Sequence, residues 1–177
     1  VTTTPLQIIR GVAAIVNGGR VLKPQLVRKI ESPDGSFRDT DFGPEVMSKV
    51  DIDRRILDKV KEGMVSVVND QRGTGKRVQL PKELGITVGG KTGTAQVVSL
   101  DSHRSGGERE HHAWFVGFAP AEDPKIAVVA LVEHGGGGGL VAAPIVKQVL
   151  EAYFGYKAPE EPEEQKKPEA PKHFERD

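Results

Sequence analysis

Apolar residues recur with helical spacing in three segments of the chain. The first follows Thr4-Pro5, which favours a helix start because threonine caps a first turn and proline fits its first position, and it ends at Asn17-Gly18-Gly19. The second begins after Asp53, and the third covers residues 140–154 with Pro144 in its first turn. The apolar stripes are Leu6, Ile9, Val12, Ala13 and Val16; Ile56, Leu57, Val60, Met64, Val67 and Val68; and Ile145, Val149, Leu150 and Tyr153. This spacing predicts three amphipathic helices.

Three further segments are rich in apolar and β-branched residues, and they predict strands. They cover residues 86–100, 113–120 and 126–132. The last run is continuously apolar, which favours burial on both of its faces. The short turn Glu122-Asp123-Pro124 joins the last two runs and indicates an antiparallel hairpin. The pattern therefore predicts an α/β (α+β) fold in which helices flank an antiparallel sheet.

The segments between these elements carry weaker patterns. Residues 21–30 alternate loosely and predict a strand, Ser32-Pro33-Asp34-Gly35 predicts a turn, and a polar connection continues to about Val50. Three glycine-bearing segments predict a flexible basic loop, an exposed charged loop and a flexible turn; they are residues 72–77, 101–110 and 135–139, respectively.

Composition excludes several classes of function. Lysine plus arginine equals aspartate plus glutamate at 25 each, which argues against a nucleic-acid partner because phosphate binding requires a basic surplus. The chain has no cysteine, so disulfides and thiolate metal sites are excluded. It contains no apolar run long enough to predict a membrane span.

The last part of the chain differs in composition from the rest. From residue 157 it is rich in proline, glutamate and lysine, and such a segment buries too little apolar area to offset the entropy of ordering. We therefore predict a domain over residues 1–156 and a disordered tail over residues 157–177. The chain opens with Val1 rather than methionine, so we expect it to be a fragment or a trimmed form of a longer protein.

The candidate chemistry lies in the central segment, Gly89-Gly90-Lys91-Thr92-Gly93-Thr94-Ala95-Gln96. Together with Gly85, its first residues match the nucleotide-binding pattern G-x-x-x-x-G-K-[ST]. That pattern requires a strand before the first glycine and a helix at the lysine, and neither is predicted here. We therefore expect no phosphate cradle at this position.

The same residues fit the Lys-Thr-Gly element of serine acyl-transferases that act on penicillin. Lys91 would supply a fixed positive charge to a substrate carboxylate, and the hydroxyls of Thr92 and Thr94 would bind the same group. Gly93 would let a peptide or β-lactam backbone approach, and the amide of Thr94 would donate to an oxyanion. Strict alternation places Lys91 and Thr92 on opposite faces, so both reach one cleft only at a twisted strand edge. A glycine-rich edge strand without a ligand fits these residues as well.

Other residues that often carry chemistry have structural explanations. Neighbouring His111 and His112 point to opposite faces of a strand, so no metal is expected, and His134 is predicted to be structural or exposed. The aromatic residues Trp114, Phe115 and Phe118 are predicted to lie in the core or in a cleft wall.

Several motifs in order resemble those of class B penicillin-binding proteins. They are Thr4-Pro5-Leu6-Gln7, Asn17-Gly18-Gly19, Gly73-Thr74-Gly75, residues 90–96, residues 114–120, Asp123-Pro124-Lys125 and Ala142-Ala143-Pro144. The resemblance covers residues 1 to about 156. Residues 96–100 and the charged segment before His112 are similar to the penicillin-binding protein 2 branch of that family.

The resemblance implies a peptidoglycan D,D-transpeptidase that cross-links stem peptides by serine acyl transfer and is trapped by β-lactams. It implies no metal or organic cofactor, a membrane glycosyltransferase of the elongation machinery as a possible partner, and a location on the extracytoplasmic side of the inner membrane. It also assigns carboxylate binding and proton relay to Lys91, Thr92 and Thr94. A β-lactamase, a D,D-carboxypeptidase and a non-catalytic β-lactam sensor remain alternatives.

Two motifs of that family are missing from the chain. None of its seven serines is followed by lysine three residues later or by asparagine two residues later, so neither Ser-x-x-Lys nor Ser-x-Asn is present. We therefore expect the chain to be the C-terminal part of a transpeptidase domain, contributing the third to fifth strands and the last helix, and to be inactive by itself.

Overall fold

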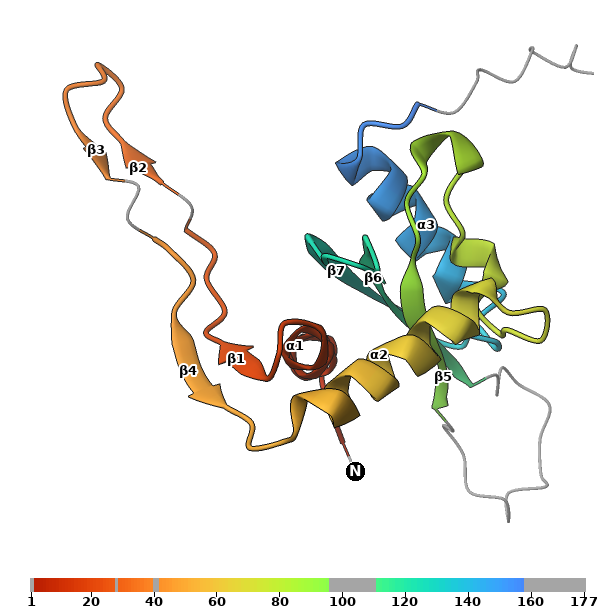
Figure 1. The fold of residues 1–177 in the computed structure, drawn as a ribbon. Helices are drawn as coiled ribbons and strands as arrows, with labels where there is room; N and C mark the ends of the chain where they lie inside the picture. Colours follow the sequence, from red (N-terminus) through yellow and green to blue (C-terminus); the bar gives the residue numbers. More distant parts are fainter. Residues whose placement is uncertain (1, 28, 40–41, 96–110, 158–177) are drawn as a thin grey trace, which may run out of the picture.

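A three-stranded antiparallel sheet lies at the centre of the molecule (Figure 1). The computed structural model describes residues 2–27, 29–39, 42–95 and 111–157. The strands β5 (Gly89–Ala95), β6 (His112–Ala119) and β7 (Ile126–Val132) lie in the order β5-β6-β7. All three predicted strands and the hairpin between β6 and β7 are confirmed. The first strand begins three residues later than predicted, and its predicted continuation over 96–100, with the loop 101–110, lies outside the described residues.

The prediction that residues 126–132 are buried on both faces is wrong. Every residue of β7 is only half-buried, although the strand is continuously apolar. Both faces of β7 pack against the core clusters, but among the described residues β7 pairs only with β6, so it is an edge strand whose other hydrogen-bonding edge is unpaired.

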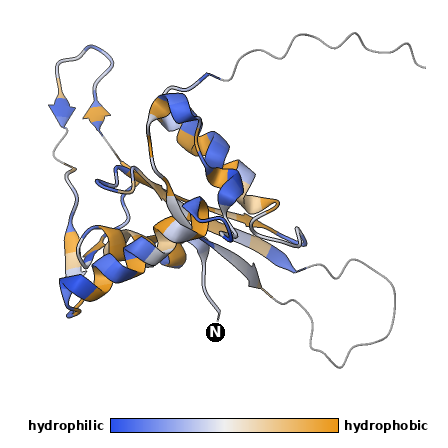
Figure 2. Cartoon of the chain, turned by 45° about the vertical axis from the view of Figure 1, so that its right-hand side comes forward, coloured by the Kyte–Doolittle hydropathy of each residue, from blue (hydrophilic) through white to orange (hydrophobic). Residues whose placement is uncertain are grey.

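Helices cover the two faces of the sheet. On one face lies α3 (Ala142–Tyr153), and on the other lies α1 (Pro5–Val16), while α2 (Arg54–Asn69) crosses β5 and contributes to the packing on both sides (Figure 1). Hydrophilic and hydrophobic residues alternate around α2 and α3 (Figure 2), as the predicted stripes require. The three predicted helices are thus confirmed, with the third beginning two residues later than expected.

Side-chain alternation along β6 divides the core into two clusters. Phe115 packs towards α3 with Val68 of α2 and Val146 and Leu150 of α3. Phe118 packs towards α1 with Val12 and Met64. Both phenylalanine rings are fully buried, which confirms their predicted core position; Trp114 is half-buried and lines a cavity instead.

Local capping explains where α1 and α2 begin. Thr4 and Gln7 form a capping box: the Gln7 amide donates to the Thr4 hydroxyl at 3.3 Å, and the Thr4 amide donates to Gln7 Oε1 at 2.8 Å. At α2 the Asp53 carboxylate accepts a hydrogen bond from the Arg55 amide at 2.8 Å. The Arg55 guanidinium also donates to this carboxylate, at 2.7 Å from Nη2, and this side-chain bond together with the amide bond lowers the pKa of Asp53. Each cap satisfies amides that a first helical turn leaves without intrahelical partners.

A long arm projects from the body between α1 and α2 (Figure 1). It consists of two antiparallel ribbons, β1 (Arg20–Leu22) with β4 (Val46–Lys49) and β2 (Ile30–Glu31) with β3 (Arg38–Asp39). The prediction of one strand over 21–30 is therefore wrong, because residues 23–27 form no ladder, and the predicted polar connection contains two strands. Pairing between distant segments forms this arm, and periodicity in a single segment does not predict such pairing.

The predicted turn over residues 32–35 closes the tip of this arm. The Gly35 amide donates to the Ser32 carbonyl at 3.0 Å. The Asp34 carboxylate accepts hydrogen bonds from the hydroxyls of Ser32 and Ser36 at 2.6 and 2.7 Å. These bonds lower the pKa of Asp34 to about 2. In the part of the chain that the structure describes, no helix has the length and apolar character needed to cross a membrane.

Candidate functional site

Core packing, rather than ligand binding, requires the first two glycines of β5. A Cβ at Gly89 would lie 2.3 Å from the ring of Phe118, and one at Gly90 would lie 2.6 Å from the ring of Phe115. Because these rings lie on opposite faces of the sheet, both glycines are needed for the strand to pack.

Lys91 lies on the face of the sheet that α1 covers. It pairs in register with Val116, is exposed, and donates a hydrogen bond from Nζ to the Thr92 carbonyl at 2.9 Å. Beside it lies a cavity of about 300 Å³, and its lining is Thr3, Ile8, Lys91, Thr92, Gly93, Thr94, Ala95, Trp114, Val116 and Val129. Lys91 is the only charged residue in this lining, so the cavity is apolar with a cationic edge.

Thr92 and Thr94 lie on the opposite face, in register with Phe115 and Ala113. The hydroxyls of Thr92 and Thr74 are 3.0 Å apart and form a hydrogen bond. These residues border a second cavity of about 450 Å³, lined by Gly73, Thr74, Lys76, Arg77, Thr92, Thr94, Gly137, Gly138, Gly139 and Leu140. The predicted opposition of Lys91 and Thr92 is therefore observed. Both threonines also border the cavity beside Lys91, so at the edge of β5 residues from both faces of the strand line the same cavity.

The segment over residues 72–77 is a defined turn, so its prediction as a flexible loop is wrong. The Gly75 amide donates to the Val67 carbonyl at 2.9 Å, and the Gly73 amide donates to the Asp70 carbonyl at 3.0 Å. These bonds satisfy groups at the end of α2 and fix Thr74 beside Thr92. Sequence reasoning assigned Thr74 no role, although the Gly-Thr-Gly pattern was recognised.

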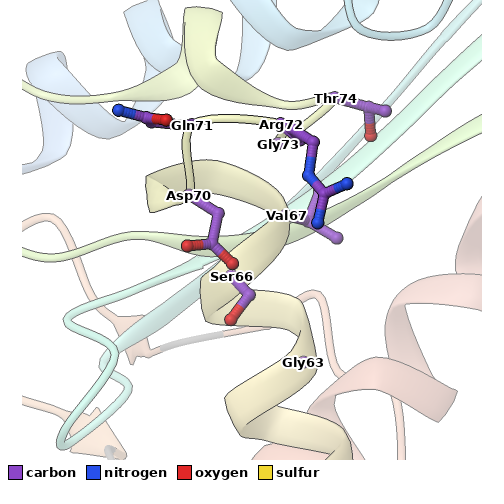
Figure 3. Close-up of a pocket in the computed structure, with 8 residues that line it drawn as sticks. All are labelled: Gly63, Ser66, Val67, Asp70, Gln71, Arg72, Gly73 and Thr74. Carbon is purple, nitrogen blue, oxygen red and sulfur yellow. The ribbon is translucent and has the colours of Figure 1, made fainter.

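A third cavity, of about 590 Å³, lies at the C-terminal end of α2 and shares Gly73 and Thr74 with the second (Figure 3). Its lining comes from α2 and the turn that follows. Figure 3 shows the side chains of Asp70 and Arg72 beside the end of α2. No ion pair between these two side chains is formed in the described structure, so Arg72 keeps its charge available at the surface.

The five-glycine segment is packed against β5 and is not the flexible turn that was predicted. A Cβ at Gly138 would lie 2.1 Å from the Trp114 carbonyl oxygen and 2.5 Å from the Gly93 carbonyl oxygen. At Gly139 it would lie 2.2 Å from the Thr74 carbonyl oxygen. Only a backbone without side chains can approach two other backbones so closely. This segment therefore forms the wall of the second cavity.

The histidines at the end of the sheet have a structural role. The His134 amide donates to Nδ1 of His112 at 3.0 Å, and the two rings meet edge to face at 4.9 Å between centroids. His134 has a φ of 52°, a conformation that this hydrogen bond supports. The described residues contain no group of three or more histidine, aspartate or glutamate side chains able to hold a metal ion.

The fold and the site define an α/β domain whose sheet carries a cationic, hydroxyl-rich strand edge between two cavities. Residues 1–151 match the family model of the penicillin-binding protein transpeptidase domain. The chain belongs to this family.

Individual relatives support the same assignment. The chain is 33% identical to the peptidoglycan D,D-transpeptidase MrdA of Haemophilus influenzae over 90% of its own length and 25% of that protein. It is 35% identical to the peptidoglycan D,D-transpeptidase PbpA of Mycobacterium tuberculosis, over 86% of the chain and 29% of that protein.

Solved structures resemble the fold over a similar part of the chain. Penicillin-binding protein A of M. tuberculosis, as a ceftriaxone acyl-enzyme complex, matches with a TM-score of 0.70 and 32% identity over 86% of this chain and 32% of that one. PBP2 of Pseudomonas aeruginosa in complex with WCK 5153 matches with a TM-score of 0.65 and 35% identity over 85% of this chain and 29% of that one. The chain thus spans about a quarter to a third of these relatives.

Proposed function

We propose that the chain is the C-terminal part of a peptidoglycan D,D-transpeptidase that forms peptide cross-links by serine acyl transfer. The observation that carries the proposal is the clustering of Lys91, Thr92 and Thr94 at one strand edge, where all three border a single cavity. A fixed ammonium and two hydroxyls are suited to a carboxylate. The relatives named as peptidoglycan D,D-transpeptidases add the reaction class.

In the proposed reaction the nucleophilic serine comes from outside this chain, because the sequence contains no Ser-x-x-Lys. Its Oγ bonds to the penultimate carbonyl carbon of a stem peptide, the peptide C–N bond breaks, and D-alanine leaves with the serine proton. An amine of a second stem peptide then takes the acyl group and returns a proton to the serine.

Residues of this chain bind and stabilise in both steps. Lys91 and the hydroxyls of Thr92 and Thr94 hold the terminal carboxylate, and Lys91 supports the proton relay. The Thr94 amide donates to the oxyanion as it forms. Such donors act because they are oriented before the charge develops.

The proposal includes an extracytoplasmic site of action, because the peptidoglycan that is cross-linked lies outside the inner membrane. It also includes a membrane glycosyltransferase as partner, which rests on the similarity of residues 96–100 to the penicillin-binding protein 2 branch. Co-purification of the full-length protein with such a glycosyltransferase after mild detergent extraction tests this part. Recovery of the protein from the cytosol alone would contradict it.

The central experiment measures acylation by a fluorescent penicillin. The full-length protein that contains this chain should be labelled, whereas the 177-residue chain alone should not. Lys91→Gln should slow acylation of the full-length protein by about 10²- to 10³-fold, the typical cost of losing one such contact. Lys82→Gln is the matched control, because Lys82 is exposed outside both cavities and its side chain makes no bond to the described residues.

Three results would contradict the proposal. They are labelling of a serine in the isolated chain, absence of labelling in the full-length protein, and an unchanged rate for Lys91→Gln. Turnover of stem peptides separates the alternatives: cross-linked products support a transpeptidase, and release of D-alanine to water alone indicates a carboxypeptidase. Binding of penicillin without stem-peptide turnover would indicate a sensor.

A further inference from the structure

The lining of the cavity beside Thr92 and Thr94 has an unbalanced charge. Two of its residues, Lys76 and Arg77, are cationic, and none is acidic. The chain as a whole is neutral, with 25 basic and 25 acidic residues. Lys91 lies across β5 from this pair, so three cations and no carboxylate border the two faces of one strand in the described structure.

The backbone that carries Arg77 is held by the core. Arg77 lies in the short helix η1 (Lys76–Val78), whose last residue, Val78, is fully buried. The Val78 amide donates to the Gly75 carbonyl at 3.1 Å, and Gln79 Nε2 donates to the Val68 carbonyl at 2.9 Å. Packing therefore sets the position of the Arg77 backbone beside the cavity, and the exposed side chain extends from this fixed point.

The two cations differ in whether their side chains already make hydrogen bonds within the protein. Lys76 donates a hydrogen bond from Nζ to the Gln71 carbonyl. Arg77 is exposed, and its side chain makes no hydrogen bond or ion pair with the residues that the structure describes. A guanidinium offers parallel donors that match a carboxylate in a bidentate geometry, so Arg77 is the group available to a ligand.

We propose that Arg77, supported by Lys76, forms a second carboxylate subsite across β5 from Lys91. This inference rests on the proposed function, and it specifies the ligand: an acyl donor or β-lactam with two carboxylates. Lys91, Thr92 and Thr94 hold the first carboxylate, which is adjacent to the reacting carbonyl. Arg77 holds the second, and the hydroxyls of Thr92 and Thr94 connect the two subsites because they border both cavities.

Exposure sets the size of the expected effect. An ion pair that forms in contact with water contributes little, and removing it changes a rate by about threefold to fivefold. Such an interaction is also screened by salt. The subsite is therefore expected to select among ligands rather than to determine whether acylation occurs.

The test uses two penicillins that differ by one carboxylate. Benzylpenicillin carries a single carboxylate, and carbenicillin carries a second on its side chain. The second-order acylation rates of the full-length protein are measured with both, and the ratio of carbenicillin to benzylpenicillin is the readout. Arg77→Gln should lower this ratio about threefold to fivefold, with the benzylpenicillin rate nearly unchanged, which also reports that the variant is folded.

Two variants and a salt series serve as controls. Arg77→Lys keeps the charge but loses the paired donors of the guanidinium, so its ratio should lie between those of the wild type and Arg77→Gln. Lys82→Gln removes a cation outside the cavity and should leave the ratio unchanged. Raising the salt concentration should lower the wild-type ratio towards that of Arg77→Gln, because screening removes the same interaction. If Arg77→Gln does not fold, the second subsite is tested by the ratio measured for Arg77→Lys and by the salt dependence of the wild-type ratio.

The outcomes separate this inference from the function on which it rests. An unchanged ratio in Arg77→Gln, an equal fall in Lys82→Gln, or a salt-independent wild-type ratio would overturn the second subsite while leaving the transpeptidase proposal in place. Failure of the wild-type protein to react with either penicillin would overturn both.

Discussion

Replacing Gly138 with alanine tests whether the wall of the site depends on contact between backbones. Gly138 lies against β5 and β6, and an added Cβ would sit 2.1 Å from the Trp114 carbonyl oxygen and 2.5 Å from that of Gly93. Neither obstacle is a flexible side chain. The substitution therefore has to separate the glycine segment from the sheet or distort the strand that carries Lys91.

The size of the expected loss of stability follows from these distances. Ordinary van der Waals contact begins at about 3.4 Å, so the backbones must separate by about 1 Å. Overpacking of this kind costs about 1–3 kcal/mol. For a chain of this size, a loss of about 2 kcal/mol lowers the midpoint of thermal unfolding by about 4–8 °C. The same shift would widen the cavity around Thr92, so acylation of the full-length protein should slow as well.

Gly137→Ala is the matched control in the same segment. Its Cβ would meet only the Leu140 side chain, at 3.6 Å or more. That substitution should be neutral or stabilising by about 0.4–1 kcal/mol, through the reduced entropy of the unfolded chain. The assay is thermal unfolding followed by far-UV circular dichroism. Equal midpoints for the two variants would refute the reasoning, since it predicts that neighbouring glycines differ because of what each one contacts.

Three further predictions concern the core, a helix cap and the arm. Phe115→Ala removes a fully buried ring and should lower the free energy of unfolding by about 3–5 kcal/mol in urea titration, whereas Leu26→Ala in the exposed arm should change it by less than about 0.5 kcal/mol. Thr4→Ala breaks the capping box of α1 and should cost about 1 kcal/mol, measured as a lower urea midpoint at constant slope; an unchanged midpoint would mean that the cap is dispensable. The lowered pKa of Asp34, about 2 instead of 3.8, means that its bonds stabilise the turn above about pH 3.8 and are lost as the pH falls through about 2. The amide resonance of Ser36 should titrate with a midpoint near 2, and a midpoint near 4 would contradict the observed bonds.

Elements with a repeated burial pattern were predictable from the sequence. The period of α1, α2 and α3 follows from one covered face, and the apolar run of β6 follows from a strand that is covered on both faces; each pattern is encoded in consecutive residues. Phe115 and Phe118 illustrate this, because their odd and even positions place them on opposite faces. Helix starts were predictable for the same reason, since Thr4 and Asp53 act within their own turns.

Contacts between distant segments were not predictable in the same way. The ribbons of the arm are two to four residues long and pair across up to 29 positions of the chain, as Arg20 does with Lys49. The bond between Thr74 and Thr92 joins residues 18 positions apart. The approach of Gly138 to Gly93 crosses 45 positions. No local period encodes such pairs, so the sequence placed Lys91, Thr92 and Thr94 on a strand but did not predict the glycine wall beside them.

These contacts show which residues of the candidate site affect its position and which affect only its surface chemistry. Lys91, Thr74 and Thr94 are exposed and contribute little packing, so substitutions there should affect ligands more than the fold. Their positions are set by backbones that meet at glycines, where an added side chain has no space. In the proposed function the two tasks are therefore separate: glycines determine where the strand edge lies, and the polar side chains on it would determine what it binds. A variant that alters binding through Gly138 should lose stability together with activity, whereas one that acts through Lys91 should lose activity alone.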